Sequence, residues 1–365
     1  MPQKMSEVYR AILSTGSVFD ASVSRDLARG ATSRAIMIFM LCVLVLPTSG
    51  ALILPTSGRT FAPDAAAVLI DLRPSASPPI ADGACAMPLA TLEQRLFELP
   101  PPGEWPLSLV GSRDELAAAR ALLQPKGWEV SEIVSDDHGA LDSLPPSTGG
   151  VQLPSSPYRP NSFLAAALDE LELPHADSAG LAVDLGCGSG RDAVHIASVL
   201  AQRAPRWSVL GLDNHAAALT RGRTLAERVL STPPSAVGRA GSARRCEFEE
   251  ADLRKRGLEA VLTRRANEPL RLVHGCRWLD VPLLAQIPSL LAPGGTVLWS
   301  TFLDPPDGSE PLAPPYRRSR RLSSGQMREL LGESSGMEVL YDGEGELLTR
   351  SRWCTAQFFC ARRRE

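Results

Sequence analysis

Residues 161–365 alternate between short apolar runs and amphipathic stretches of helical length. The apolar runs are LAVDLG, WSVLGLD, CEFEEAD, LRLVHG and TVLWSTF, and the stretches between them are RDAVHIASVLAQ, HAAALTRGRTLAERVL, GLEAVLTRR and VPLLAQIPSLLA. Strand–helix units joined by right-handed crossovers form a doubly wound parallel sheet that binds ligands at the carboxyl ends of its strands. We therefore predict an α/β fold for this part of the chain.

The end of the chain predicts how this sheet is completed. After a loop rich in proline and arginine come a helical stretch, SGQMRELLG, and two apolar runs, MEVLYD and CTAQFFCAR. Only Gly343–Arg352 separates these two runs, so they are expected to pair as a hairpin whose final strand runs antiparallel. The prediction is a seven-stranded Rossmann-like sheet with an antiparallel last strand.

The loop before that helix carries four arginines: Arg317, Arg318, Arg320 and Arg321. They could close over an anionic substrate or contact RNA, or they could belong to a solvated loop. The only aromatic residue among them is Tyr316, which gives little support for base stacking. We favour a solvated loop.

A second, smaller α/β block precedes the large one. The run Ala65–Leu72 is typical of a buried strand, and Arg113–Leu123 predicts a helix with Leu116, Ala119 and Leu123 on one face. A stretch rich in proline, serine and glycine separates the two blocks. We predict a small domain at 61–132, a linker at 133–160 and the large domain at 161–365.

The first 60 residues are expected to lie outside both domains. The apolar run Ala35–Leu46 follows several arginines and has the length of a signal-peptide core, short for a membrane span. We interpret 1–60 as a targeting segment for the secretory route or an organelle such as the plastid, with a cytoplasmic location as the alternative. Only an uncleaved segment would bring the protein to a membrane.

Charge and cysteine content exclude several classes of function. The net charge of −3 gives no reason to expect nucleic acid as a partner. The seven cysteines include no CxxC pair and no spacing with histidine that suits zinc. We predict neither a disulfide framework nor a metal site.

The turn in AVDLGCGSGRDAVHIA, Ala182–Ala197, indicates a nucleotide site. Gly186, Gly188 and Gly190 stand between a strand and a helix, where glycines let the backbone approach a ligand. A dinucleotide fingerprint wants glycine or alanine at the next position, which here is Arg191. The bulky side chain argues against a dinucleotide.

Two carboxylates follow the next strands. Asp213 ends VLGLD and could accept hydrogen bonds from a ribose diol, while Asp252 ends FEEAD and could accept from an adenine amino group. Alternatively, Asp213 caps a strand end and Asp252 caps a helix. Their placement after successive strands favours the ligand.

Together with Gly294-Gly295 before the fifth strand and the final hairpin, this set resembles class I S-adenosylmethionine-dependent methyltransferases. DLGCGSGRDAVHIA and VHGCRWLDVPLLAQIPSLLAPGGTVLWSTF are similar to the tellurite/thiopurine-resistance-like branch. The resemblance implies S-adenosyl-L-methionine as cofactor, with Asp184, Gly186, Gly188 and Gly190 beside its methionine moiety. It implies Asp213 at the ribose and Asp252 with Leu253 at the adenine.

Methyl transfer mostly requires alignment of donor and acceptor, so the candidates for acceptor binding lie at the end of the fourth strand. They are Arg277 as anchor for an anion, His274, Cys276 and Trp278. Arg277 could instead pair with Asp280 on the surface, and His274 could simply pack at the strand end. Cys187, without a neighbouring base in sequence, is interpreted as a small turn residue. We expect a methyltransferase for a small-molecule acceptor such as a thiol or metalloid oxyanion.

The small block resembles a rhodanese-like domain in VLIDLRP, MPL and the segment from LSLVGS to KGWEV. The resemblance implies a catalytic cysteine after the central strand, but Gly111 stands there. Sulfur transfer needs a thiolate at that position, and Cys85 lies on another segment, so the domain is predicted to be inactive. An alternative for the whole chain is a non-catalytic sensor or scaffold protein.

Overall fold

A computed structural model describes residues 67–74, 84–135, 157–230, 246–304, 321–348 and 353–365. They contain two sheets, which we call the small-sheet part (residues 67–135) and the large-sheet part (residues 157–365). Both parts belong to one compact unit, Ala51–Glu365. The proposed targeting segment lies outside the described residues. Within those ranges, no helix combines the length and the hydropathy that a membrane crossing requires.

The small-sheet part has four parallel strands in the order β2-β1-β3-β4. Its elements are β1 (Val68–Asp71), β2 (Cys85–Ala86), α4 (Leu89–Leu92), η1 (Glu93–Glu98), β3 (Leu107–Gly111), α5 (Arg113–Leu123), η2 (Gln124–Lys126) and β4 (Val130–Val134). The predicted helix has the bounds of α5 and buries the expected Leu116, Ala119 and Leu123. Strand β4 extends into the residues predicted as linker because it pairs along the whole of β3.

The large sheet follows the order β11-β12-β9-β8-β5-β6-β7, with the short β10 beside β9. Its strands are β5 (Gly180–Leu185), β6 (Trp207–Asp213), β7 (Cys246–Glu250), β8 (Leu270–Cys276), β9 (Thr296–Leu303), β10 (Arg321–Leu322), β11 (Met337–Leu348) and β12 (Trp353–Arg363). β12 is antiparallel to β9 and to β11, as the hairpin predicts. The large sheet is therefore Rossmann-like with an antiparallel last strand, as the sequence predicts.

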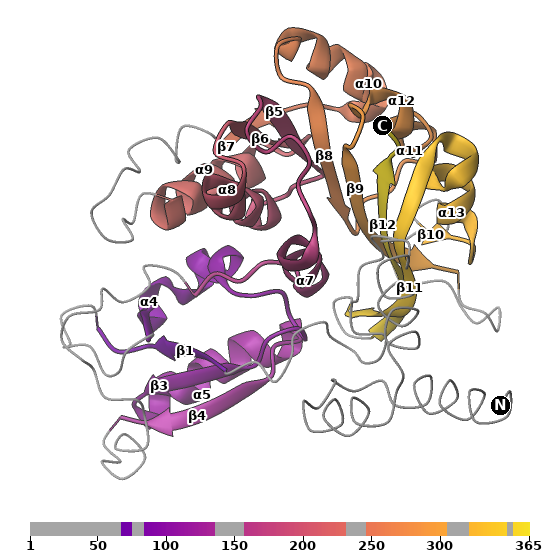
Figure 1. The fold of residues 1–365 in the computed structure, drawn as a ribbon. Helices are drawn as coiled ribbons and strands as arrows, with labels where there is room; N and C mark the ends of the chain where they lie inside the picture. Colours follow the sequence, from indigo (N-terminus) through magenta and orange to yellow (C-terminus); the bar gives the residue numbers. More distant parts are fainter. Residues whose placement is uncertain (1–66, 75–83, 136–156, 231–245, 305–320, 349–352) are drawn as a thin grey trace, which may run out of the picture. The chain divides into compact units, whose positions relative to one another are not determined.

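Helices cover both faces of the large sheet (Figure 1). They are α7 (Ser162–Glu170), α8 (Arg191–Arg203), α9 (Ala216–Leu230), α10 (Leu253–Leu262) with η4 (Thr263–Arg265), α11 (Val281–Leu284), α12 (Ile287–Leu290), and α13 (Gln326–Leu331) with η6 (Glu333–Ser335). Along β5, Ala182 packs with α7, α8 and α9, whereas Leu181, Val183 and Leu185 pack with α10 to α13. β5 is therefore buried on both faces, as expected for a central parallel strand.

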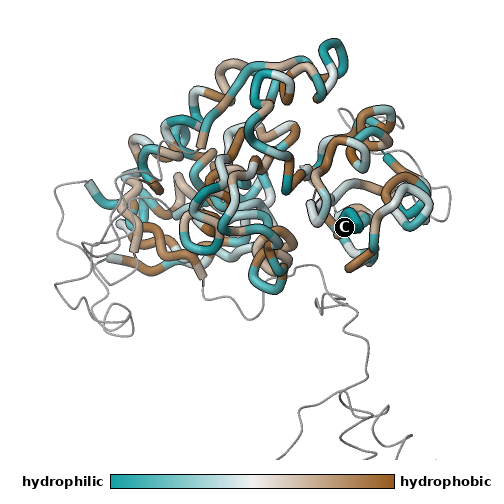
Figure 2. Tube along the Cα trace, turned by 45° about the horizontal axis from the view of Figure 1, so that its top comes forward, coloured by the Kyte–Doolittle hydropathy of each residue, from teal (hydrophilic) through white to brown (hydrophobic). Residues whose placement is uncertain are grey.

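Hydrophobic and hydrophilic stretches alternate along the described chain in Figure 2. This is the pattern of buried strands joined by helices and loops that face solvent on one side.

Three local expectations differ from the structure. VPLLAQIPSLLA forms two short helices because Pro288 lacks an N–H and its ring crowds the carbonyl four residues earlier, at Leu284, where α11 ends. The loop expected at Gly343–Arg352 is shorter, since β11 continues to Leu348. Arg321, expected in a solvated loop, is buried and pairs with Asp304 at 3.3 Å. Its three companion arginines lie outside the described residues.

Candidate functional site

The turn between β5 and α8 needs glycine at three positions. Gly186, Gly188 and Gly190 have φ values of 68°, 54° and 73°. A Cβ at Gly186 would lie 2.5 Å from Cγ of Trp278, and one at Gly190 would overlap the Phe248 ring. A Cβ at Gly188 would meet nothing within 4 Å. Gly186 and Gly190 therefore permit close packing as well as the left-handed backbone.

Asp213, at the end of β6, closes this turn. Its Oδ2 accepts a hydrogen bond from the Gly188 N–H at 2.9 Å, and its Oδ1 accepts from the His215 N–H at 2.9 Å. A carboxylate has about four lone-pair positions, so both oxygens retain capacity for a ligand. The alternative interpretation of Asp213 as a local cap and the interpretation as a ligand-binding residue are thus compatible.

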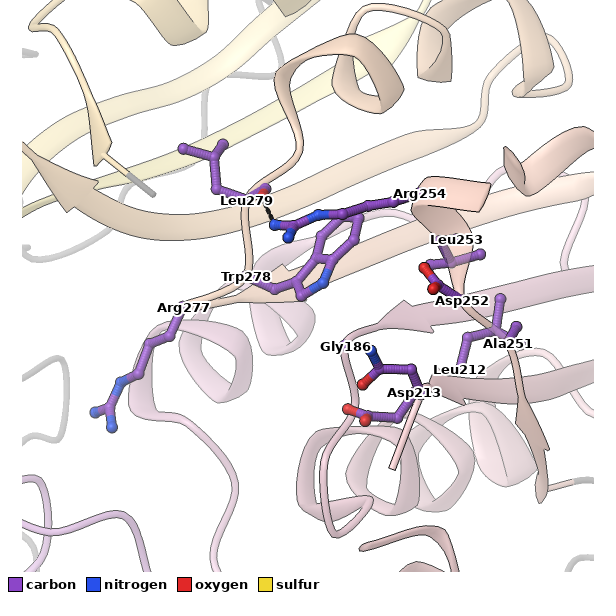
Figure 3. Close-up of a pocket in the computed structure, with 11 residues that line it drawn as sticks. Gly186, Leu212, Asp213, Ala251, Asp252, Leu253, Arg254, Arg277, Trp278 and Leu279 are labelled. Atoms are coloured by element: carbon purple, nitrogen blue, oxygen red, sulfur yellow. Dashed lines mark hydrogen bonds between the residues drawn. The ribbon is translucent and has the colours of Figure 1, made fainter. Parts of the chain in front are cut away.

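A pocket of about 200 Å³, which we call the nucleoside pocket, lies at the ends of β5, β6, β7 and β8 (Figure 3). It brings together six of the residues singled out in the sequence: Gly186, Asp213, Asp252, Leu253, Arg277 and Trp278. Asp252 stands at the start of α10 without capping it and instead contacts the Lys255 ammonium at 3.2 Å. The Asp252 carboxylate, whose pKa is lowered by its hydrogen bond from Lys255, lines the pocket and is partly exposed.

A second pocket of about 230 Å³, the turn pocket, lies on the other side of the glycine turn. Its lining residues are Phe97, Pro101, Glu104, Asn161, Asp184, Gly186, Cys187, Gly188, Ser189, Arg191, Asp192, Cys276 and Arg277. Gly186 and Arg277 line both pockets. The first three residues belong to the small-sheet part, so that part contributes to the candidate site.

Two buried groups at the turn pocket have an atom without a hydrogen-bond partner among the described residues. They are Oδ2 of Asp184 and Nε of Arg191. Burial lowers the pKa of Arg191, because the charged guanidinium is poorly solvated there. A carboxylate and a guanidinium left incompletely bonded at one pocket suit a ligand with an ammonium and a carboxylate.

His274 lies in neither pocket. Its side chain is fully buried, and Nδ1 lies 2.8 Å from Oδ1 of Asp184 across the β5–β8 pairing. Burial alone would lower the pKa of His274, but the Asp184 carboxylate more than offsets this and the pKa is raised. His274 thus orients Asp184, which agrees with the alternative that it packs at the strand end, and its role in acceptor binding stays a prediction.

Arg277 has a partner that the sequence did not reveal. Its Nη2 lies 3.4 Å from Oε1 of Glu104, whereas Asp280 pairs with Arg254. In Figure 3 the Arg277 side chain points away from Asp213 and Asp252. Arg277 also has φ of 57°, which costs about 1–2 kcal/mol for a residue with a Cβ. Such strain at a pocket is typical of functional positions.

The two cysteines that line the turn pocket are not poised as nucleophiles. Burial raises the pKa of the Cys187 thiol far above its usual value, with Asp184 and Asp213 adding to the effect. Burial also raises the pKa of Cys276 to about 12. The interpretation of Cys187 as a turn residue agrees with this chemistry, because the thiolate is the reactive form.

No protein-family model matches the chain, and no curated protein matches it. Among solved structures it is similar to a SAM-dependent methyltransferase from Methanosarcina mazei, with 16% identity over 53% of this chain and 94% of that one and a TM-score of 0.35. It is also similar to magnesium protoporphyrin IX methyltransferase from Synechocystis PCC 6803, with bound SAH. The identity is 18% over 55% of this chain and 80% of that one, with a TM-score of 0.36. A third similarity is to TehB from Haemophilus influenzae, with 13% identity over 56% of this chain and 68% of that one and a TM-score of 0.36.

Proposed function

We propose that the large-sheet part is an S-adenosyl-L-methionine-dependent methyltransferase for a small-molecule acceptor. The observation that carries the proposal is the pair of pockets that meet at Gly186 and Arg277. One pocket offers Asp213 and Asp252 to a nucleoside, and the other offers Asp184 and Arg191 to an amino-acid end. A molecule with an adenosine at one end and an amino acid at the other fits both.

The residues divide the work of binding between them. Asp213 would accept hydrogen bonds from the ribose hydroxyls, and Asp252 with Leu253 would hold the adenine. Trp278, packed over Gly186 and beside Trp299 with ring centroids 6.0 Å apart, would wall off the nucleoside pocket. When bound, the cofactor supplies an activated methyl group, and the chain aligns it with the acceptor and excludes water.

Calorimetric titration of the full chain with S-adenosylmethionine tests the proposal. Replacing Asp252 by alanine removes a charge-assisted hydrogen bond, so the dissociation constant should rise about tenfold. Asp252→Ala is a cleaner test than Asp213→Ala, because Asp213 also holds the Gly188 and His215 amides.

Glu250 provides the matched control, since it is exposed and lines neither pocket. Glu250→Ala should leave the affinity within about twofold of wild type, well below the effect of losing a charged hydrogen bond. Absence of binding to the wild-type chain contradicts the proposal. Binding with no turnover of any phenol, amine, thiol or oxyanion would favour the alternative, a nucleotide-binding sensor or scaffold protein.

We further propose that the small-sheet part, which corresponds to the domain predicted at 61–132, is a rhodanese-like domain without sulfurtransferase activity. Gly111 ends β3 where the nucleophile would stand, and burial raises the pKa of Cys85 to about 11. Both features leave the part without a ready thiolate. A thiosulfate:cyanide assay should show no activity above background, and clear turnover would contradict the proposal.

The proposed targeting role of residues 1–60 has a separate test. Cleavage at a targeting site would leave a mature chain that begins near residue 60, ahead of β1. N-terminal sequencing of the protein from its native cells measures this directly. A mature N-terminus at Met1 would contradict the proposal.

A further inference from the structure

The loop between η1 and β3 brings a buried carboxylate from the small-sheet part to the turn pocket. Glu104 is 4% exposed, and its Oε2 accepts a hydrogen bond from the Ser162 N–H at 2.8 Å. Its Oε1 has two longer contacts, with Nδ2 of Asn161 and Nη2 of Arg277, both at 3.4 Å. Oε2 is therefore held by a short hydrogen bond at the start of α7, whereas the two contacts of Oε1 are long and weak enough for a ligand to replace them.

Glu104 lines the turn pocket and contacts the guanidinium of Arg277, a residue that lines both pockets. Gly186 also lines both pockets, so the two pockets meet at Gly186 and Arg277. A molecule that spans both pockets has its middle at this junction. In S-adenosylmethionine the middle is the sulfonium that carries the transferable methyl group.

The charges around the turn pocket are unfavourable for an anionic acceptor. Its lining contains three carboxylates, Glu104, Asp184 and Asp192, and two guanidinium groups, Arg191 and Arg277. Glu104 compensates Arg277, the group that the sequence suggested as an anchor for an anion. A cation at the junction would be repelled by Arg277 and attracted by Glu104, so the carboxylate makes a sulfonium tolerable there.

We propose that Glu104 is the acceptor-side carboxylate of the methyltransferase site, and that the acceptor is a neutral molecule with an O–H or N–H nucleophile. The proposal rests on the proposed function. As the bond between the methyl carbon and the acceptor oxygen or nitrogen forms, the bond between that carbon and sulfur breaks. The acceptor proton passes to Oε1 of Glu104, and S-adenosylhomocysteine leaves with the former bonding electron pair.

The environment of Glu104 favours this role. Burial raises the pKa of the carboxyl group, although Arg277 and the Ser162 amide lower it in part. A carboxylate with a raised pKa is a better proton acceptor at neutral pH than an exposed one. The small-sheet part is then a component of the active site, whatever other partner it has.

Three probes that need no knowledge of the acceptor test the proposal by calorimetry on the full chain. S-adenosylmethionine carries a sulfonium, sinefungin carries an ammonium in its place, and S-adenosylhomocysteine carries a neutral thioether. Replacing Glu104 by glutamine should lower the affinities for S-adenosylmethionine and sinefungin about tenfold relative to the affinity for S-adenosylhomocysteine. Only the first two probes place a cation beside the carboxylate. Glu104→Asp keeps the charge, so the ratios of the three affinities should stay within about threefold of wild type. This variant shows whether a change in Glu104→Gln comes from the lost charge or from a folding defect.

Glu98 supplies the matched control. It is another buried carboxylate of the small-sheet part, paired with Arg95 and with Arg228 of α9, but it lines neither pocket. Glu98→Gln should leave all three ratios unchanged. If Glu104→Gln weakens the three probes equally, or none of them, Glu104 only joins the two parts and the proposal is overturned.

Two further outcomes are separable. Failure of the wild-type chain to bind any of the three probes overturns the proposed function itself, and the inference with it. Titration of the S-adenosylhomocysteine complex with sodium selenite tests the acceptor class. We expect no saturable heat, and saturable binding of this oxyanion would overturn the neutral acceptor while leaving the proposed function intact.

Discussion

Two of the strand–turn–helix junctions among the described residues, one in each sheet, are built in opposite ways. Between β3 and α5, Oγ of Ser112 accepts from the Glu115 N–H at 3.3 Å, and Oε2 of Glu115 accepts from the Ser112 N–H at 2.8 Å. Between β5 and α8, the residue at the helix start is Gly190, which offers no side-chain cap. The first helix is thus capped from within its own first turn, whereas the second begins at an uncapped glycine beside Asp184 and Arg191, which line the turn pocket.

This difference indicates which sheet binds a ligand. Amides at a helix start favour a negative or hydrogen-bond-accepting group, and in α5 that group is already covalently present. In the large-sheet part the turn is made of glycines instead, and the nearby Asp184 and Arg191 each retain an unbonded atom. The two junctions have the same order of strand, turn and helix, so the fold does not show which one binds a ligand. The difference in helix capping does.

The largest expected effect comes from adding a methyl group to each turn. Gly190→Ala combines a positive φ with overlap of the Phe248 ring, so we expect a loss of about 3 kcal/mol in the free energy of unfolding. Gly111 has no such backbone strain. The added Cβ in Gly111→Ala would lie 3.2 Å from Cβ of Glu115, a tight contact that a small shift relieves, so a loss below about 1 kcal/mol in the free energy of unfolding is expected.

Chemical denaturation of both variants measures the difference. Gly188→Ala separates strain from overlap, because its φ is 54° but no atom lies within 4 Å of the added group. It should lose about 1–2 kcal/mol. Equal losses at Gly190 and Gly111 would show that the two turns are not built differently.

A smaller effect is expected from removing the cap that fills the first junction. Ser112→Ala eliminates the side-chain bond to the Glu115 amide and should lower the free energy of unfolding by about 1 kcal/mol. Because this junction is predicted to bind nothing, the affinity for S-adenosylmethionine should stay within about twofold. A marked loss of affinity in this variant would mean that the small-sheet junction takes part in binding.

The smallest expected effect is a change of stability with pH, and it concerns the aspartates of the two central strands. Asp71 on β1 pairs with Arg73, which stays protonated at all ordinary pH values, whereas Asp184 on β5 pairs with His274. The raised pKa of His274 means that its pairing stabilises the fold fully below the unfolded pKa of about 6.5 and less as pH rises through the folded value.

Unfolding measurements between about pH 5.5 and 9 should therefore show that the destabilisation caused by His274→Gln shrinks as pH rises through the folded pKa. Arg73→Gln should cause a destabilisation that is constant over the same range. A pH-independent His274→Gln effect would contradict a charged His274–Asp184 pair.

Local sequence signals predict most helices and strands and, within the candidate site, the nucleoside pocket. Ser112 and Glu115 form a capping box that begins α5 where expected, and the hairpin places β12 antiparallel to β9. The nucleoside pocket follows from strand ends, since Asp213 and Asp252 close successive neighbouring strands.

The rest depends on pairings between distant segments. Glu104 lies in a proline- and glycine-rich loop that carries no motif, 173 positions from Arg277, and His274 meets Asp184 across 90 positions. Neither hydrophobic periodicity nor motif spacing predicts contacts between residues so far apart in the sequence. A buried acid beside a tryptophan in a loop, at Glu104-Trp105, is the only local hint.

Hydrogen exchange of the full chain, with and without S-adenosylmethionine, tests the difference between the two junctions most directly. Ligand should slow amide exchange in peptides covering 184–194 and 251–254, where the glycine turn and Asp252 lie. Peptides covering 108–118, with the self-capped α5, should exchange at the same rate in both samples. Protection of 108–118, or no protection at 184–194, would contradict the account.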